Sequence, residues 1–176
     1  MPFWNRSSLS IEGGVVSEAQ AIQPGQPVPE FESPATGDRT VKLSDLLGQY
    51  VVLYFYPKDH TPGCTTEGRA FRDLYPEFQR LNAEIFGVSR DSLKTHANFK
   101  ARQELPFDLI SDKEETLCRL FGVLKQKKMF GREVFGIERS TFLIDPEGRL
   151  LAEWRKVKVK GHAEAVLETL KESQSG

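Results

Sequence analysis

The feature that most constrains this chain is an unbroken run of apolar and aromatic residues, VVLYFY, at positions 51–56. The run lacks the alternation of a half-exposed strand, so it predicts a strand covered on both faces, as in the middle of an α/β sheet. Pro57 ends the run, and a short loop leads to the sequence TPGC at positions 61–64. Thr61 is a suitable N-cap and Pro62 suits the first helical position, which predicts a helix that begins just before Cys64.

Beyond Cys64 the chain alternates between helical and extended patterns. The first segment has an apolar stripe at helical spacing, formed by Phe71, Leu74, Phe78 and Leu81. Pro76 lies within this predicted helix, so we expect a kink there. We expect further strands at 85–89, 107–110, 141–144 and 150–154, a loop or hairpin at 131–136, and helices at 92–103, 114–121 and 163–170. The turn at 145–148 pairs the last two strands. This order predicts an α/β thioredoxin-like fold, with a central mixed sheet and helices on both faces.

The two ends of the chain suggest a simple domain organisation. Residues 1–20 show little periodicity, so we expect an N-terminal extension with freedom to move, followed by one domain at 21–176. The net charge is −1, which gives no reason to expect a nucleic-acid partner. The one basic stretch, Lys156–Lys160, alternates with valine, and we interpret it as an edge strand protected by lysines.

The sequence also bears on where the protein works. No apolar run approaches the roughly 20 residues of a membrane span, and residues 1–20 lack the pattern of a secretory signal. Two cysteines, far apart in the sequence, are fewer than a secreted disulfide scaffold would use. We therefore expect a cytoplasmic protein without a membrane partner.

The helix start at Cys64 is the strongest candidate for chemistry. The first turn of a helix carries unpaired N–H groups and the positive end of the helix dipole, and both favour a thiolate over a thiol. Gly63 would let another group approach the backbone closely. A buried and inert cysteine is the alternative, since cysteine is often buried. The strand, loop and helix context favours a reactive Cys64.

The surrounding residues resemble a known family. The pattern Pro57-x-x-x-Thr61-x-x-Cys64 resembles the active-site signature of the peroxiredoxins. The longer stretch, YFYPKD at 54–59 with TPGCT at 61–65, is similar to the branch called bacterioferritin comigratory protein or peroxiredoxin Q. The sequence IERSTFLID at 137–145 resembles the arginine-bearing strand of the same branch. The likeness covers about residues 21–172.

The resemblance implies a thiol-dependent peroxidase that reduces hydrogen peroxide and organic hydroperoxides. Cys64 would attack the peroxide and become a sulfenic acid. Thr61 would hold the thiolate and peroxide in line, and Arg139 would stabilise the thiolate and the leaving oxygen. Pro57 would shield the sulfur from water. Arg139 could instead form a plain ion pair with a glutamate, and Glu67 could either orient Arg139 or be solvated.

Three competing functions are weaker. A thioredoxin-like disulfide reductase needs a second cysteine three residues after the first, where this chain has Glu67. A binding module on the same fold has no need of Thr61, Cys64 and Arg139 together. His60 precedes Cys64 by four residues, but two candidate ligands do not make a zinc site. We therefore expect neither a metal nor a cofactor.

Recycling of the oxidised cysteine is where the chain departs from its family. The branch's positions for a resolving cysteine correspond to Arg69 or to the helix around Lys100. The remaining cysteine, Cys118, lies on the flank of a helix, where we expect a half-buried packing role. We expect a monomeric one-cysteine enzyme reduced by an external thiol, from thioredoxin or from glutathione with glutaredoxin. A two-cysteine mechanism with Cys118 as the resolving residue is the alternative.

Overall fold

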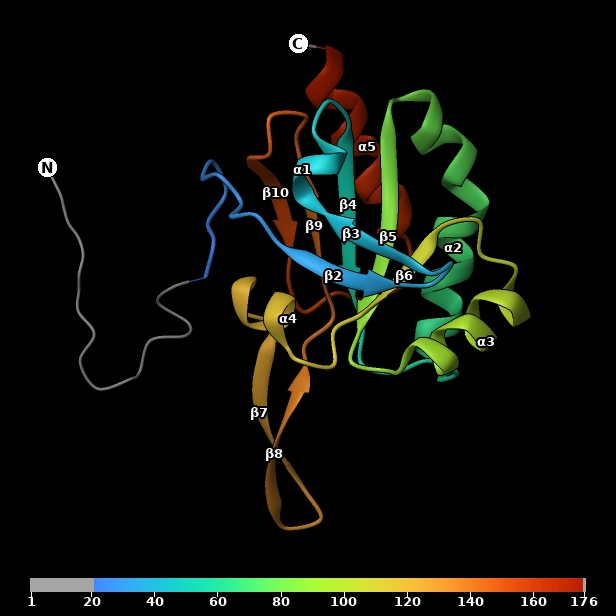
Figure 1. Ribbon diagram of the computed structural model, residues 1–176, viewed down its shortest axis with the longest axis vertical. Coiled ribbons are helices and arrows are strands. Elements are labelled where there is room, and N and C mark those ends of the chain that lie inside the picture. Colours follow the sequence, from blue (N-terminus) through green and yellow to red (C-terminus); the bar gives the residue numbers. More distant parts are fainter. Residues whose placement is uncertain (1–20, 176) are drawn as a thin grey trace, which may run out of the picture.

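A seven-stranded mixed sheet forms the centre of the protein in the computed structural model, which describes residues 21–175 (Figure 1). In spatial order its strands are β10 (Leu150–Trp154), β9 (Ser140–Ile144), β4 (Tyr50–Phe55), β5 (Ala83–Ser89), β6 (Asp108–Ser111), β2 (Glu32–Ala35) and β3 (Arg39–Lys42). Strands β4, β5 and β6 are parallel, and the other neighbours pair antiparallel. The predicted central mixed sheet and the antiparallel pairing of its last two strands are confirmed, and the structure places this hairpin beside β4.

Helices cover both faces of this sheet. Helix α2 (Pro62–Arg80) joins β4 to β5, and α3 (Leu93–Gln103) joins β5 to β6. Their buried residues share one apolar cluster with those of the last helix, α5 (His162–Ser175). The short helices α1 (Leu43–Leu46) and α4 (Thr116–Leu120) pack into the other cluster. Helix α2 runs without interruption through Pro76.

Strand β4 separates these two clusters. Val51, Leu53 and Phe55 pack into the cluster that contains α1 and α4. Val52, Tyr54 and Tyr56 pack into the cluster that contains α2, α3 and α5. All six side chains are almost fully buried. Burial on both faces explains why the run at 51–56 shows no alternation of apolar and polar residues.

A second, two-stranded sheet stands apart from the central one. Strands β7 (Leu124–Met129) and β8 (Arg132–Ile137) form a hairpin, which is one of the two forms that the sequence predicts for residues 131–136. The hairpin projects beyond the end of the central sheet at which β4 ends and α2 begins (Figure 1). Phe130 lies at its tip with 95% of its surface exposed.

The prediction of an edge strand at Lys156–Lys160 is wrong. Strand β10 ends at Trp154, and the next segment is irregular. Lys156 adopts a left-handed backbone with φ of 52°, which breaks the extended path. The segment instead supports its neighbour, because the Val157 N–H donates to the Arg139 carbonyl oxygen over 3.0 Å.

Two further expectations meet the structure only in part. The N-terminal extension predicted for residues 1–20 lies outside the described residues. Within residues 21–175, no helix has the length and apolar character needed to span a bilayer.

Candidate active site

Cys64 lies in the first turn of α2, at the carboxyl end of the buried strand β4. Thr61 occupies the N-cap position and Pro62 is the first helical residue, as the sequence predicts. The predicted cap by the Thr61 side chain is absent, because its hydroxyl donates to the Lys58 carbonyl oxygen over 2.8 Å. That bond leaves the lone pairs of the Thr61 hydroxyl oxygen free to accept a hydrogen bond. The Cys64 side chain is 1% exposed.

Strand pairing brings Arg139 to the same place. Ser140 at the start of β9 pairs with Phe55 at the end of β4, so Arg139 lies where β4 leads into α2. Its Nη2 donates to the Cys64 sulfur over 3.5 Å. Its Nη1 donates to Glu67 Oε1 over 2.7 Å. One guanidinium therefore contacts both the sulfur and a glutamate, and the role of Arg139 in the chemistry stays a prediction.

The charges of this group influence each other strongly. Glu67 is 1% exposed, and burial raises the pKa of its carboxyl to about 7 despite the facing Arg139. Burial alone would lower the pKa of Arg139, but the negative charges of Glu67 and Cys64 raise it. Arg139 thus stays fully protonated beside the sulfur. The guanidinium is a fixed positive charge 3.5 Å from the sulfur.

Gly63 leaves room for this guanidinium. A Cβ at Gly63 would lie only 3.1 Å from Arg139 Nη2. The sequence prediction that Gly63 permits a close approach is therefore consistent with the structure, and Arg139 is the approaching group.

Two buried polar atoms beneath the site have no hydrogen-bond partner among the described residues. They are Glu67 Oε2 and the Tyr54 hydroxyl. Burial, followed by the negative charge of Glu67, raises the pKa of Tyr54 well above its ordinary value. Tyr54 therefore remains a neutral phenol next to the charged groups of the site. Pro57 is exposed on the loop after β4, and its shielding role stays a prediction.

A buried network under the same loop has no counterpart in the sequence patterns. Asp59 bonds both Tyr56 and His96, and all three side chains are buried. His96 belongs to no motif that the sequence analysis identifies. Its contact with Asp59 joins residues 37 positions apart, so no local pattern could have revealed it.

Cys118 lies on the opposite side of the sheet from Cys64. Cys64 belongs to the cluster of α2, α3 and α5, whereas Cys118 belongs to that of α1 and α4. The expectation of a half-buried side chain is wrong, because Cys118 is 0% exposed. Burial and the nearby Asp112 carboxylate raise the pKa of the Cys118 thiol far above its usual value. Cys118 is thus a packed, protonated thiol.

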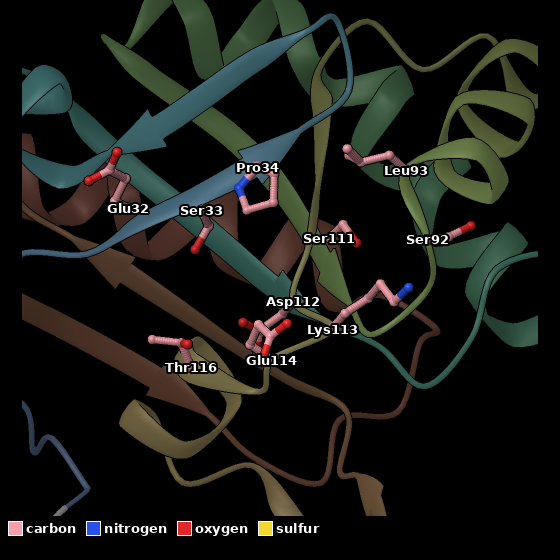
Figure 2. A pocket seen from close by; sticks show the side chains of 10 residues that line it. All are labelled: Glu32, Ser33, Pro34, Ser92, Leu93, Ser111, Asp112, Lys113, Glu114 and Thr116. Atoms are coloured by element: carbon pink, nitrogen blue, oxygen red, sulfur yellow. The ribbon is translucent and has the colours of Figure 1, made fainter.

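A pocket of about 320 Å³ lies apart from the cysteine (Figure 2). Residues of β2, the start of α3 and the segment from Ser111 to Thr116 line it. Asp112 is among the lining residues that Figure 2 labels, and its carboxylate accepts from the N–H groups of Leu117 and Cys118 at the start of α4. None of Thr61, Cys64 and Arg139 lines this pocket, so it is not the place where chemistry at the sulfur occurs.

Comparisons with known proteins show the family of this chain. The model of the AhpC/TSA family matches residues 24–152. The chain belongs to this family. Peroxiredoxin Bcp of Bacillus subtilis is 56% identical over 151 residues, which are 86% of this chain and 96% of the relative. Peroxiredoxin Bcp of Xanthomonas campestris is 54% identical over 147 residues, 82% of this chain and 92% of the relative. This peroxiredoxin is accordingly a thiol-dependent peroxidase, as the resemblance implied.

Solved structures support the fold of this peroxiredoxin. The bacterioferritin comigratory protein of Xanthomonas campestris, studied for alkyl peroxide reduction, superimposes with a TM-score of 0.79 at 53% identity. That match covers 81% of this chain and 91% of the other. A PrxQ mutant of Xylella fastidiosa gives a TM-score of 0.83 at 46% identity, over 87% and 98% of the two chains. The predicted thioredoxin-like fold is confirmed.

Proposed function

We propose that Cys64 is the peroxidatic nucleophile of this peroxiredoxin and that hydrogen peroxide and alkyl hydroperoxides are its substrates. The observation that carries the proposal is the Arg139 guanidinium, which contacts the Cys64 sulfur and the buried Glu67 at the start of a helix. The alkyl substrates follow from the similarity to the Xanthomonas campestris protein studied for alkyl peroxide reduction. The thiolate attacks the terminal peroxide oxygen, the O–O bond breaks, and Cys64 becomes a sulfenic acid. The other oxygen leaves with the bonding electrons and takes a proton to give water or an alcohol.

The neighbouring residues serve this displacement. Arg139 Nη2 is directed at the sulfur, where it stabilises the negative charge before and during the attack. The Thr61 hydroxyl donates to Lys58, so its oxygen is oriented to accept the O–H of the incoming peroxide. Holding the peroxide between these groups places the O–O bond in line with the sulfur. Pro57 closes the outer side of the loop against water.

The sulfenic acid is then reduced by an external thiol. Support comes from the placement of Cys118, which is buried in a core cluster on the other side of the sheet. A thiol of thioredoxin, or of glutathione, would attack the Cys64 sulfur, form a mixed disulfide and release water. A second thiol, from thioredoxin or from glutathione with glutaredoxin, would then break that disulfide and restore the Cys64 thiol. Comparing turnover with each reductant under the same peroxide concentration identifies the physiological class. A lack of turnover with both reductants would contradict this part of the proposal.

We further propose that the enzyme acts as a monomer in the cytoplasm. Both cysteines are free thiols in the structure, which suits a reducing compartment. Light scattering on the reduced protein tests the monomer, and cell fractionation tests the location. A dimer mass, or recovery outside the cytoplasmic fraction, would contradict the respective statement.

The central test is the variant Cys64→Ser. We expect it to fold normally and to lose peroxide reduction, because a serine hydroxyl is not ionised beside Arg139 at neutral pH. Cys118→Ala is the matched control, since it removes the other thiol and should leave single-turnover oxidation unchanged. Near-normal turnover by Cys64→Ser would refute the assignment of the nucleophile.

A further inference from the structure

The hairpin of β7 and β8 carries apolar side chains that remain exposed to solvent. Among the described residues six large apolar side chains are exposed, and the hairpin holds three of them: Phe130, Val134 and Phe135. Val134 and Phe135 are consecutive on β8, so their side chains point to opposite faces of the hairpin. The hairpin is therefore open on both faces and at its tip, and no step of the peroxidase chemistry described above uses it.

The hairpin is also basic. Residues 124–137 contain four lysine or arginine residues and one acid, Glu133, which gives a net charge of +3. Lys128 and Arg132 stand on either side of the tip, and both are exposed. The almost fully exposed ring of Phe130 thus lies between cations. This combination suits a surface with anionic groups outside and apolar matter beneath.

A second basic segment, residues 156–160, lies at the same end of the molecule. Lys156, Lys158 and Lys160 are exposed, and the Val157 N–H donates to the Arg139 carbonyl oxygen. Arg139 follows the last residue of β8 by two positions, so the segment borders the base of the hairpin. Together the hairpin and the segment carry a charge of +6, and the total of −1 leaves −7 for the rest of the chain. An anionic surface therefore attracts this end and repels the rest, which orients the molecule.

The base of the hairpin is held in a fixed direction. The Glu138 N–H donates to the Val123 carbonyl oxygen over 2.7 Å and closes the base. Arg90, which follows β5, donates through Nη2 to the Phe135 carbonyl oxygen over 3.1 Å and through Nη1 to Glu115 over 2.9 Å. These bonds tie the hairpin to the end of the central sheet at which the catalytic helix begins (Figure 1). A surface that binds the tip therefore faces the active-site end of the molecule.

We propose that this end of the molecule docks reversibly on an anionic lipid surface. Phe130 enters the headgroup region, and the cations of the hairpin and of segment 156–160 bind lipid phosphates. The outer edges of a two-stranded sheet have no strand partner, so the hairpin cannot pass into the hydrocarbon. One aromatic ring and a few cations give weak binding, which leaves the protein in the cytoplasm between encounters. The sequence expectation of no membrane partner rested on the lack of a spanning segment and did not address a surface of this kind.

Lipid fits this surface better than a macromolecular partner does. A protein interface would bury one face of the hairpin, whereas lipid headgroups surround an inserted tip on every side. A nucleic-acid duplex offers phosphates but no apolar layer for Phe130 and Val134. Docking also brings the catalytic end to hydroperoxides formed in the lipid, a consequence that rests on the proposed function of Cys64.

Sedimentation with vesicles tests the docking. The probes are vesicles of equal parts of phosphatidylglycerol and phosphatidylcholine, and vesicles of phosphatidylcholine alone. We expect the full chain to bind the anionic vesicles only, and added salt to release it. Phe130→Ser should weaken binding by about tenfold or more, because it removes the apolar contact. Lys158→Gln should weaken binding by about fivefold, as the loss of one cation near a charged membrane does.

Exposed residues at the far end of the molecule are the matched controls (Figure 1). Leu47→Ser removes an apolar side chain that is 53% exposed after α1, and Lys171→Gln removes an exposed cation from α5. Both variants should bind anionic vesicles like the wild type. Phe130→Trp should retain binding, and the emission of the added tryptophan should shift to shorter wavelength on anionic vesicles. Because all these positions are exposed, the variants should fold.

Several outcomes would overturn the proposal. One is that the full chain does not sediment with anionic vesicles, or sediments equally with both kinds. Another is that Phe130→Ser and Leu47→Ser bind the vesicles alike. A nucleic-acid partner is indicated if a DNA duplex binds more tightly than the vesicles. A protein partner is indicated if Phe130→Ser keeps vesicle binding but loses turnover of hydrogen peroxide with thioredoxin.

Reduction of a phospholipid hydroperoxide held in the anionic vesicles measures the consequence of docking. Phe130→Ser should reduce it more slowly than the wild type, while both reduce dissolved hydrogen peroxide at the same rate. Cys64→Ser keeps the two proposals distinct, because it should bind vesicles like the wild type and reduce neither peroxide. Peroxide reduction by Cys64→Ser would refute the assigned nucleophile and leave docking intact. Normal peroxide reduction by a wild type that does not bind vesicles would do the reverse.

Discussion

The guanidinium of Arg139 lies so close to Gly63 that a Cβ there would come within 3.1 Å of Nη2. We therefore expect alanine at Gly63 to displace the Arg139 guanidinium by a few tenths of an ångström and to disturb its contact with the Cys64 sulfur. Gly63 is helical, so alanine should leave the free energy of unfolding unchanged or raise it by up to about 1 kcal/mol. We expect Gly63→Ala to slow peroxide reduction on the order of tenfold, because small displacements of reacting groups are costly.

Gly68→Ala is the matched control for this prediction. Gly68 is also in α2, and a Cβ there would meet Leu105 and the Tyr54 hydroxyl at an ordinary 3.6 Å. Stopped-flow oxidation of both variants by hydrogen peroxide measures the difference. Equal rates for the two alanine variants would show that crowding of Arg139 has no effect on the reaction.

Arg139 itself should be more sensitive. Arg139→Gln removes the charge beside the sulfur, and we expect peroxide attack to slow on the order of 10²-fold, since one preorganised charged donor is worth about 3 kcal/mol. Alkylation by iodoacetamide should reach half its maximal rate at a higher pH. Arg139→Lys keeps the positive charge, but its single ammonium lacks the two terminal nitrogens with which the guanidinium contacts Cys64 and Glu67 at once. An intermediate rate is therefore expected. Arg119→Gln, at an exposed ion pair, is the control. An unchanged rate and pH profile in Arg139→Gln would remove Arg139 from the site.

Much of this site follows from local patterns in the sequence. Residues adjacent in the sequence were enough to predict the strand at 51–56, the helix start at Pro62 and the close approach of another group to Gly63. The Asp59–His96 bridge and the Thr61 hydroxyl bond could not be predicted, because each depends on how the loop folds back. The strand predicted at Lys156–Lys160 fails for a similar reason. Its alternation with valine is real, but the backbone of Val157 serves Arg139 instead.

Glu67 should make stability depend on pH. Its pKa is about 7 in the folded protein, above its ordinary value of 4.5. Between these values the folded state holds a proton that the unfolded chain has released. Binding of this proton contributes about 3 kcal/mol to the free energy of unfolding. The contribution is full below about pH 4.5 and is lost as the pH rises to 7. In Glu67→Gln this loss should be absent from denaturant unfolding measured across the range. A curve parallel to that of the wild type would show that Glu67 does not titrate there.

His162 should act in the opposite direction. Burial, followed by the positive charge of Arg139, lowers the pKa of His162 to about 4 from an ordinary 6.5. The neutral imidazole contributes about 3 kcal/mol to the free energy of unfolding. This contribution is full above pH 6.5 and is lost as the pH falls to 4. In the wild type the two effects largely cancel. His162→Asn should therefore become less stable as the pH rises from 4.5 to 7, whereas Glu67→Gln becomes more stable. Slopes of the same sign would contradict this prediction.

Cys118 should not resolve the oxidised Cys64. The central sheet separates the two thiols, because alternate residues of β4 face the two core clusters that contain them. A disulfide needs Cα atoms within about 7 Å, so one cluster would have to open. Exposing Cys118 would break a core in which it is 0% exposed, at a cost of several kcal/mol. Its raised pKa also keeps the thiol protonated and poorly nucleophilic.

We therefore expect Cys118→Ser to turn over at the wild-type rate with a suitable external thiol. Serine brings a hydroxyl into a buried position, so some loss of stability is expected, and Cys118→Ala separates that loss from any effect on recycling. Intact-mass and peptide analysis after one equivalent of peroxide should show a sulfenic acid at Cys64, or a glutathione adduct when glutathione is present. A Cys64–Cys118 disulfide in the peptide map, together with loss of turnover in both variants, would establish the two-cysteine mechanism instead.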